Sequence, residues 1–203
     1  SDYSFVVNPD LMNFIDNRRS TFLPYIKQNY LDIEFKKEVF IKKKPLIVHS
    51  PTDRRIKGTN YINNAIKKLK EKKDFDYILI ENMPNTKALE YYKNADLVID
   101  QLRIGWYGGL AIEVMKMGIP IVVYINEKDL KFIPDQMVKD LENSLIMANP
   151  LNIMEVIEFC LDNPAIMRDK ANNCYNYVTT WHNPDSIIKT VINKYYSILD
   201  NKK

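Results

Sequence analysis

The chain uses glycine sparingly, and its few glycines lie where a bound phosphate would need them. Only five occur in 203 residues, whereas average usage is about 7%. Gly58 ends the basic run 54–58. The other four surround Glu113: Gly105, Gly108, Gly109 and Gly118. Glycine lets backbone N–H groups come close to a ligand, and basic side chains add charge, so these two places are the first candidates for a phosphate site.

Gly108 and Gly109 lie where a predicted strand gives way to a predicted helix. Backbone N–H groups and the positive end of the helix dipole converge at such a junction, and together they bind phosphate. Glu113 follows one turn into the same helix, where its carboxylate can accept hydrogen bonds from both hydroxyls of a ribose. Two plainer interpretations stay open: the glycines form only a tight turn, and Glu113 only complements the helix dipole.

Arg54 and Lys57 supply positive charge in a predicted loop between the first strand and the next helix. If the two strands concerned are neighbours, this loop and Gly108-Gly109 face one crevice at the carboxyl edge of the sheet. The alternative is a solvated turn with ordinary basic residues. Cations, backbone donors and a carboxylate together predict a nucleotide site without a Walker motif.

Short apolar runs alternate with segments of helical period from residue 45 onward. Runs such as Ile121-Val122-Val123 are continuous, as in strands that are covered on both faces. The alternation predicts a doubly wound, Rossmann-like α/β domain with a parallel sheet and helices on both faces. The predicted strands cover 46–49, 77–81, 97–100, 119–125 and 145–148. The predicted helices cover 59–72, 85–94, 109–117 and, opened by Asn149-Pro150, a stretch to about 161.

Both flanks fall outside this alternation. Residues 1–44 offer a brief strand at 4–7, a helix-like stretch at 10–16 and a charged connector that ends in three lysines. Two appended helices begin at Pro164 and at Asn183-Pro184, and the last one carries a broad apolar stripe. Such a stripe packs on its own domain or on a partner outside this chain.

Composition argues against several classes of partner. The net charge is only +3 and the lysines are spread along the chain, so nucleic acid is not an expected partner. No apolar run approaches the roughly 20 residues that span a bilayer, and a cytoplasmic protein is expected. The lysine-rich run 67–73 is typical of a solvated helix face. Its alternative role is peripheral contact with anionic lipid at the inner face of a membrane.

The thiols and imidazoles give no catalytic pattern. Cys160 and Cys174 have no second thiol or histidine at metal-ligand spacing, so reduced, buried cysteines and no metal site are expected. His49 has no acid or nucleophile paired with it in the sequence, and His182 sits at a helix boundary. Both histidines are therefore expected to be structural, with contact to a ligand at the carboxyl edge of the sheet as the alternative role of His49.

Three motifs follow one another along the chain. They are Arg54-x-x-Lys57-Gly58-Thr59, then Ala-Asp-Leu-Val-Ile-Asp-Gln-Leu at 95–102, then Gly-Trp-Tyr-Gly-Gly-Leu-Ala-Ile-Glu-Val-Met-Lys-Met-Gly-Ile-Pro at 105–120. In this order they resemble the donor-binding half of family 4 retaining glycosyltransferases, which have the glycosyltransferase B fold. The likeness extends from about Phe22 to the C-terminal helices. It implies transfer of a hexose from a nucleotide diphosphate sugar to a glycan or lipid-linked acceptor, with retention and without an obligatory metal or other cofactor.

The resemblance also implies a role for each candidate residue. Arg54 and Lys57 would neutralise the leaving diphosphate. Glu113 would hold the ribose, and the loop after Glu81, with Met83, would border the base. The remaining donor contacts would come from four backbone N–H groups: those of Tyr107, Gly108, Gly109 and Leu110.

The chain departs from the family pattern at two points. Gly105 stands where the family has the first of two glutamates, so the contact to the donor sugar differs. The acceptor-binding half that precedes this region in the family is not in the sequence, and we expect this chain to bind a donor without turnover. The predicted division is a linker with the remnant of a preceding strand at 1–44, a nucleotide-sugar-binding domain at 45–182, and a helix at 183–203 that packs toward the missing domain.

Two functions compete with an enzyme that builds a surface polysaccharide or glycolipid. Gly105 in place of a glutamate fits a non-catalytic interaction module that has kept the fold, unless Asp100, at a predicted strand end, substitutes for the missing carboxylate. Half of a nucleotide-sugar epimerase would have the same architecture, because a fold does not fix a function.

Overall fold

The computed structural model describes residues 3–35 and 38–200, and a parallel sheet of five strands forms its centre. The strand order is β4-β3-β5-β6-β7. Because the chain runs outward from β3 to β4 and then returns to β5 on the other side of β3, the winding direction reverses between β3 and β5. In open α/β sheets, such a switch point is where ligands bind. The strands are β3 Leu46–His49, β4 Asp76–Leu79, β5 Leu97–Ile99, β6 Ile121–Val123 and β7 Ile146–Met147.

The central strands form because both of their faces are covered. Ile47, Val48 and all residues of β5 and β6 are fully buried, and branched side chains of this kind pack well on a pleated surface. Burying each of them stabilises the fold by about 1.5–3 kcal/mol. The predicted parallel, doubly wound sheet is confirmed, although each strand except β3 is shorter than predicted.

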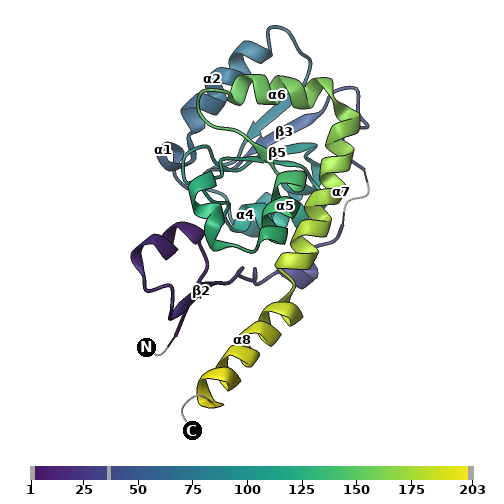
Figure 1. The fold of residues 1–203 in the computed structure, drawn as a ribbon. Helices are drawn as coiled ribbons and strands as arrows, with labels where there is room; N and C mark the ends of the chain where they lie inside the picture. Colours follow the sequence, from purple (N-terminus) through teal and green to yellow (C-terminus); the bar gives the residue numbers. More distant parts are fainter. Residues whose placement is uncertain (1–2, 36–37, 201–203) are drawn as a thin grey trace.

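Helices cover the sheet on both sides. Contacts join α4 and α5 to α7 in one layer, and α2 to α6 in another, and Figure 1 shows the sheet lying between these two groups. The α-helices are α1 Arg54–Lys57, α2 Thr59–Leu69, α3 Asn85–Asn94, α4 Gly109–Lys116, α5 Asp135–Ser144, α6 Ile153–Asp162, α7 Pro164–Trp181 and α8 Pro184–Asp200. Three 3-10 helices lie at η1 Pro9–Phe14, η2 Tyr30–Asp32 and η3 Glu127–Phe132.

The structure corrects two predicted elements. The stretch predicted as a loop around Arg54 and Lys57 is the single helical turn α1, because Asp53 caps its start by accepting hydrogen bonds from two backbone N–H groups. Gly58 then ends the turn with a φ of 77°, a conformation that favours glycine. Asn149-Pro150 opens a polar turn instead of a helix, and α6 begins three residues later, because the Asn149 N–H bonds to the side chain of Asn152.

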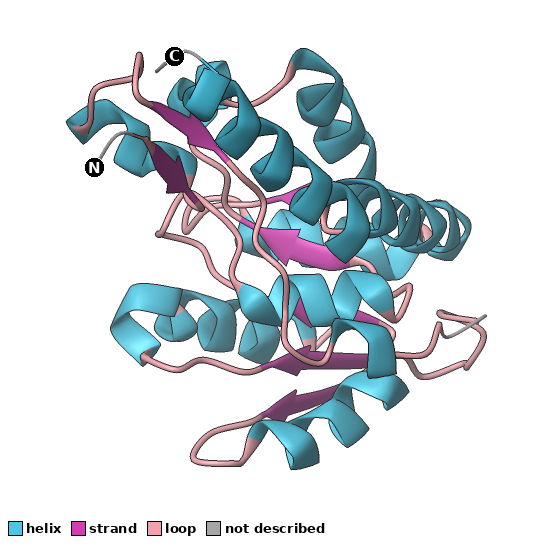
Figure 2. Cartoon of the chain, turned by 90° about the horizontal axis from the view of Figure 1, so that it is seen from below, coloured by secondary structure: helices cyan, strands magenta, loops and turns pink. Residues whose placement is uncertain are grey.

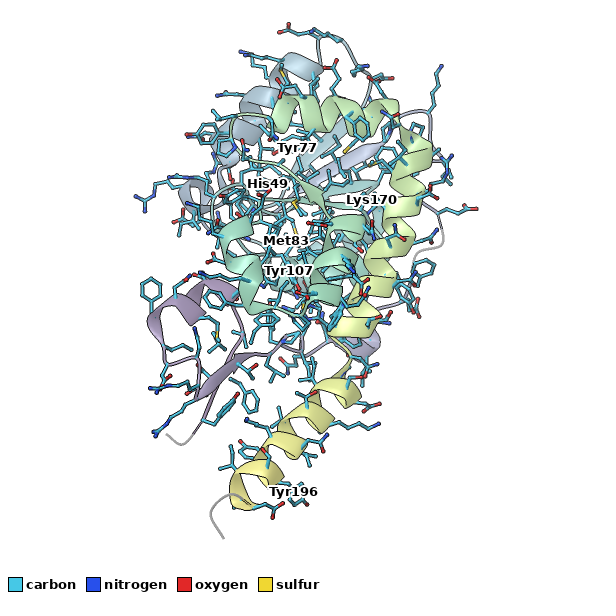
Figure 3. The ribbon with its side chains drawn as sticks, viewed as in Figure 1. His49, Tyr77, Met83, Tyr107, Lys170 and Tyr196 are labelled. Carbon is cyan, nitrogen blue, oxygen red and sulfur yellow. The ribbon has the colours of Figure 1, made fainter. Side chains whose placement is uncertain are left out.

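The N-terminal flank and the last helix lie together at one end of the molecule. The strands β1 Ser4–Val6 and β2 Ser20–Phe22 form a separate parallel pair, and α8 extends from the body toward the same side (Figures 1 and 2). The ammonium group of Lys194 lies 4.0 Å from the ring centroid of Tyr3. Tyr196, labelled in Figure 3, lies on this projecting helix and is exposed.

No helix in the described part of the chain is long and apolar enough to cross a membrane. The division at residues 44/45 and 182/183 stays a prediction.

Candidate functional site

A cavity of about 460 Å³ opens beside the carboxyl ends of β3 and β5. The two strands are neighbours, with Val48 paired to Val98, so the segments that follow them meet, as the sequence predicts for neighbouring strands. Lys57 from the first segment and Tyr107 and Gly108 from the second line the cavity. Its other walls come from Val7, Asn8, Tyr25, Ile104 and Trp106.

Asp100 joins the two segments chemically. It is fully buried at the end of β5, and its Oδ1 lies 2.5 Å from Lys57 Nζ. Its Oδ2 accepts a hydrogen bond from the Gly108 N–H at 3.2 Å. A cation and a backbone donor, the two groups that a phosphate would use, therefore already share one carboxylate.

The first turn of α4 is built for close approach. Its N-cap is Gly108, which provides no side chain to accept from the first N–H groups of the helix. A Cβ built on Gly109 would lie 3.1 Å from Lys27 Nζ and 3.3 Å from the Tyr25 hydroxyl. A larger residue at this position would require the Lys27 and Tyr25 side chains to move by a few tenths of an ångström. The backbone N–H of Leu110 belongs to the same turn, whereas Tyr107 directly precedes the N-cap.

Glu113 lies one turn into α4, and its carboxylate has three partners from the protein. Only 1% of the residue is exposed. Its Oε1 accepts from Asn29 Nδ2 at 3.0 Å and from Asn85 Nδ2 at 2.9 Å, and Lys27 Nζ lies 3.2 Å away. The sequence prediction has this carboxylate open to ribose hydroxyls, whereas the structure fills its surroundings with amide and ammonium groups.

Sequence reasoning missed these three partners. Asn29 is 84 residues from Glu113 along the chain, and residues 23–29 form no helix or strand, so no periodicity points to the contact. The one signal was the resemblance that begins near Phe22-Leu23-Pro24. Asn85 is different, because it starts α3 directly after the loop that was predicted to border a base.

Arg54 is directed toward the segment that follows β4. Its guanidinium makes two hydrogen bonds to the Glu81 carboxylate, one of them at 2.6 Å from Nε. The hydrogen bonds from Arg54 lower the pKa of Glu81. The Arg54 side chain is 53% exposed and does not line the cavity that Lys57 lines. The structure therefore brings Lys57, but not Arg54, to Gly108.

A second cavity, of about 410 Å³, lies between α3 and the segment around residues 27–33. Lys27, Asn29 and Asn85, the three partners of Glu113, all line it, together with apolar surface from Leu89. Met83, predicted to border the base, is half-buried against the core and does not line this cavity.

Two buried histidines make hydrogen bonds that connect the segments around the site. His49 donates from Nδ1 to the Ile99 carbonyl at 2.8 Å and accepts at Nε2 from the Thr59 hydroxyl at 2.9 Å, because a carbonyl can only accept. Burial lowers its pKa to about 4, so the ring is neutral at pH 7. It ties β3, β5 and α2 together beneath the cavity.

His182 ties the cavity wall to the C-terminal helices. Its Nδ1 donates to the Tyr25 carbonyl at 2.8 Å, and its Nε2 accepts from the Tyr107 hydroxyl at 2.9 Å. Tyr107, labelled in Figure 3 within the body of the domain, also bonds to the Tyr177 hydroxyl at 2.8 Å. Burial lowers the pKa of His182 to about 4 and raises that of Tyr107. Neutral groups thus hold two cavity-lining residues in place.

Gly105 has a backbone that a glutamate would not readily adopt. Its φ is 85°, and a Cβ built on it would lie 3.0 Å from Asn126 Cβ. L residues with a side chain rarely adopt this conformation. The departure from the family pattern at this position is therefore coupled to the path of the loop that follows β5.

No family model matches this chain, and no curated protein matches it. Solved structures do. Sucrose-phosphate synthase (tll1590) from Thermosynechococcus elongatus matches with a TM-score of 0.66 and 14% identity, over 99% of this chain and 59% of that one. Anabaena Alr3699/HepE in complex with UDP-glucose matches with a TM-score of 0.62 and 9% identity, over 97% of this chain and 64% of that one. The HepE complex with UDP gives a TM-score of 0.64.

This chain therefore spans about six-tenths of the length of these two proteins. At such identities the likeness concerns the fold alone. The helices and the five-stranded parallel sheet have the Rossmann-like arrangement of glycosyltransferase B proteins, as the sequence predicts.

Proposed function

We propose that this chain is the donor-binding half of a retaining glycosyltransferase and binds a nucleotide diphosphate sugar at the start of α4. One observation carries the proposal: Lys57, the Gly108 N–H and Glu113 converge on the first turns of α4, at the switch point between β3 and β5. The fold likeness supports it, because one neighbour is a sucrose-phosphate synthase and another is in complex with UDP-glucose.

In this proposal the diphosphate lies over Gly108 and Gly109. The N–H groups of the first turn of α4 donate to its oxygens, and Lys57 neutralises part of its charge. Lys57 is 8% exposed, so its ammonium group acts in a region with little water, where its field is stronger than in bulk. Arg54 contributes from the rim of the site by turning from Glu81 to the diphosphate.

The nucleoside occupies the surroundings of Glu113. Its ribose hydroxyls donate to the Glu113 carboxylate and replace amide groups that now hold it. The base extends toward α3, where Asn85 and Leu89 line the second cavity and the loop with Met83 leads into the helix. A buried carboxylate that already accepts three contacts has the geometry to accept hydroxyl groups in their place.

The proposed reaction breaks the bond between the anomeric carbon of the donor and the terminal phosphate oxygen. Negative charge then develops on the departing diphosphate, and groups placed in advance around it stabilise that charge. The anomeric carbon forms its new bond to an acceptor hydroxyl oxygen with retention, and the hydroxyl proton passes to the departing diphosphate. We assign charge neutralisation to Lys57 and Arg54 and not to a metal cofactor.

Turnover requires more protein than this chain. The matched structures are longer, and we propose that a glycan or lipid-linked acceptor is bound by a further domain. A cytoplasmic location with the exposed lysines of α2 near an anionic membrane surface suits a lipid-linked acceptor.

A non-catalytic module is the second candidate. The observation that favours it is internal pairing: Asp100 engages Lys57, and Lys27 engages Glu113. A protein that had lost its ligand would keep such pairs for stability.

Calorimetric titration with UDP, GDP and ADP separates the two candidates. We expect one nucleotide to bind with a dissociation constant in the micromolar to low millimolar range. Lys57→Met and Glu113→Gln should each weaken binding about tenfold or more, because each removes a charge-assisted contact. Lys73→Met is the matched control. This substitution also removes a cation that is paired with one carboxylate, that of Asp162. Lys73 precedes β4, however, and so lies away from the carboxyl edge of the sheet. If neither this chain nor the full-length protein binds any of the three, the proposal is wrong.

A further inference from the structure

We propose that Lys27 is a second phosphate-binding cation of this site, and that it exchanges Glu113 for the diphosphate when a donor binds. This inference rests on the proposed function. It concerns a residue that the sequence motifs do not mark, carried on an irregular segment of the N-terminal flank.

Lys27 lies where phosphate and ribose would meet. Its Nζ is 3.2 Å from Glu113 Oε1 and 3.1 Å from the position of a Cβ built on Gly109. Lys57 Nζ is 3.9 Å from the position of a Cβ built on the preceding residue, Gly108. Two ammonium groups therefore lie close to the Gly108-Gly109 backbone.

Lys27 and Lys57 have the same kind of partner. Each is paired with one buried carboxylate, Lys57 with Asp100 and Lys27 with Glu113. A nucleoside diphosphate carries more negative charge than one carboxylate and would lie against the glycines that both lysines already approach. Lys27 is 28% exposed and belongs to a flexible side-chain type, so its ammonium group can shift to a phosphate oxygen while hydroxyls take its place on Glu113.

A buried acceptor beside Glu113 points to the same ligand. Asn29 donates from Nδ2 to Glu113, but its Oδ1 is buried and has no hydrogen-bond partner among the described residues. Buried polar atoms without a partner are rare and costly. One ribose hydroxyl would donate to the Glu113 carboxylate. The neighbouring hydroxyl would then be within reach of Asn29 Oδ1. The segment that carries Lys27 therefore provides groups for both parts of a nucleotide.

The test compares a nucleotide with its own nucleoside. For whichever of UDP, GDP and ADP binds the wild-type chain, Lys27→Met should weaken nucleotide binding about tenfold. Binding of the matching nucleoside should stay unchanged or tighten, because the nucleoside has no phosphate and Lys27 competes with it for Glu113. Lys27→Arg keeps the charge and should bind the nucleotide within about threefold of wild type. Lys73→Met, whose side chain is also 28% exposed, should change neither affinity.

The outcomes are distinct. If Lys27→Met weakens nucleotide and nucleoside by the same factor, Lys27 acts only through Glu113 and the inference is overturned, while the proposed function stands. Should Lys27→Met not fold, Lys27→Gln and Lys27→Arg give the same comparison. If the wild-type chain and the full-length protein bind none of the three nucleotides, the proposed function itself fails.

Discussion

Asp100 and Lys57 form an ion pair at the point where β3 and β5 end side by side, with 2.5 Å between Oδ1 and Nζ. The same carboxylate accepts the Gly108 N–H. An internal anion thus occupies the two groups that a diphosphate would need, and a ligand must compete with it. This relationship makes the strength of nucleotide binding depend on a residue that need not touch the nucleotide.

Asp100→Asn should tighten diphosphate binding. The amide keeps the shape of the side chain but leaves Lys57 without a competing charge, so we expect affinity for the bound nucleotide to rise about three- to tenfold. Stability should fall by roughly 3 kcal/mol, because Lys57 becomes a buried cation without its partner. Calorimetric titration and urea unfolding measure the two effects.

Asp74→Asn is the control for Asp100→Asn. It removes the same charge from an exposed ion pair with Lys44, before β4, and should change neither quantity. Weaker nucleotide binding in Asp100→Asn would contradict the competition and would mean that the carboxylate helps to hold the ligand.

Gly105→Glu, which restores the acid of the family pattern, should destabilise the protein. The φ of 85° and the contact with Asn126 predict a loss of about 1–3 kcal/mol, seen as a lower urea midpoint, without tighter binding of nucleotide. Equal stability of wild type and Gly105→Glu would contradict this prediction.

Gly108→Ala should leave stability unchanged but weaken nucleotide binding. The φ of Gly108 is −106°, which alanine can adopt, and the nearest atom to an added Cβ is Lys57 Nζ.

Acid should destabilise the fold through two histidines. The pKa values of His49 and His182 are lowered by burial from 6.5 to about 4. Between pH 6.5 and pH 4 the unfolded chain binds protons at these histidines that the folded chain does not bind. The free energy of unfolding is therefore highest above pH 6.5 and falls as the pH falls toward 4. The loss is about 3 kcal/mol per histidine at most.

Urea midpoints at pH 7.5, 6 and 5 measure this slope before most carboxylates titrate. His182→Gln should be less stable at pH 7.5 but should show a smaller drop between pH 7.5 and 5. An unchanged wild-type midpoint across this range would refute the assignment of neutral, buried rings.

Cys160 and Cys174 should be inert toward thiol reagents in the folded protein. Both are fully buried, and burial raises the pKa of each thiol to about 12, so little thiolate forms at pH 8. A disulfide reagent such as dithionitrobenzoate should label neither cysteine within minutes, and both after addition of denaturant. Rapid labelling without denaturant would show that α6 or α7, which carry the two thiols, opens locally.

The sequence allows the sheet and the meeting of Lys57 with Gly108 to be predicted, because both depend on local pattern. Continuous apolar runs identify buried strands, and strands in one parallel sheet place the segments that follow them at one edge. The prediction required β3 and β5 to be neighbouring strands, and they are neighbours in the structure.

The partners of Glu113 and Arg54 escape such reasoning. Lys27 and Asn29 reach Glu113 from a segment without secondary structure, so their approach depends on tertiary packing over a long sequence separation. Arg54 has the spacing of a phosphate ligand but lies beside Glu81, since a charged side chain pairs with the carboxylate within reach. Sequence pattern finds the groups that a site contains, whereas their state of pairing depends on the fold.

His182 gives the C-terminal helix a direct connection to the cavity. It is the C-cap of α7, and α8 begins two residues later. Its ring bonds both to Tyr107 and to the backbone of Tyr25. Through these bonds the residue that ends α7 is fixed to the cavity wall. The end of α7, from which α8 departs, and two residues of the cavity wall thus share a single buried imidazole.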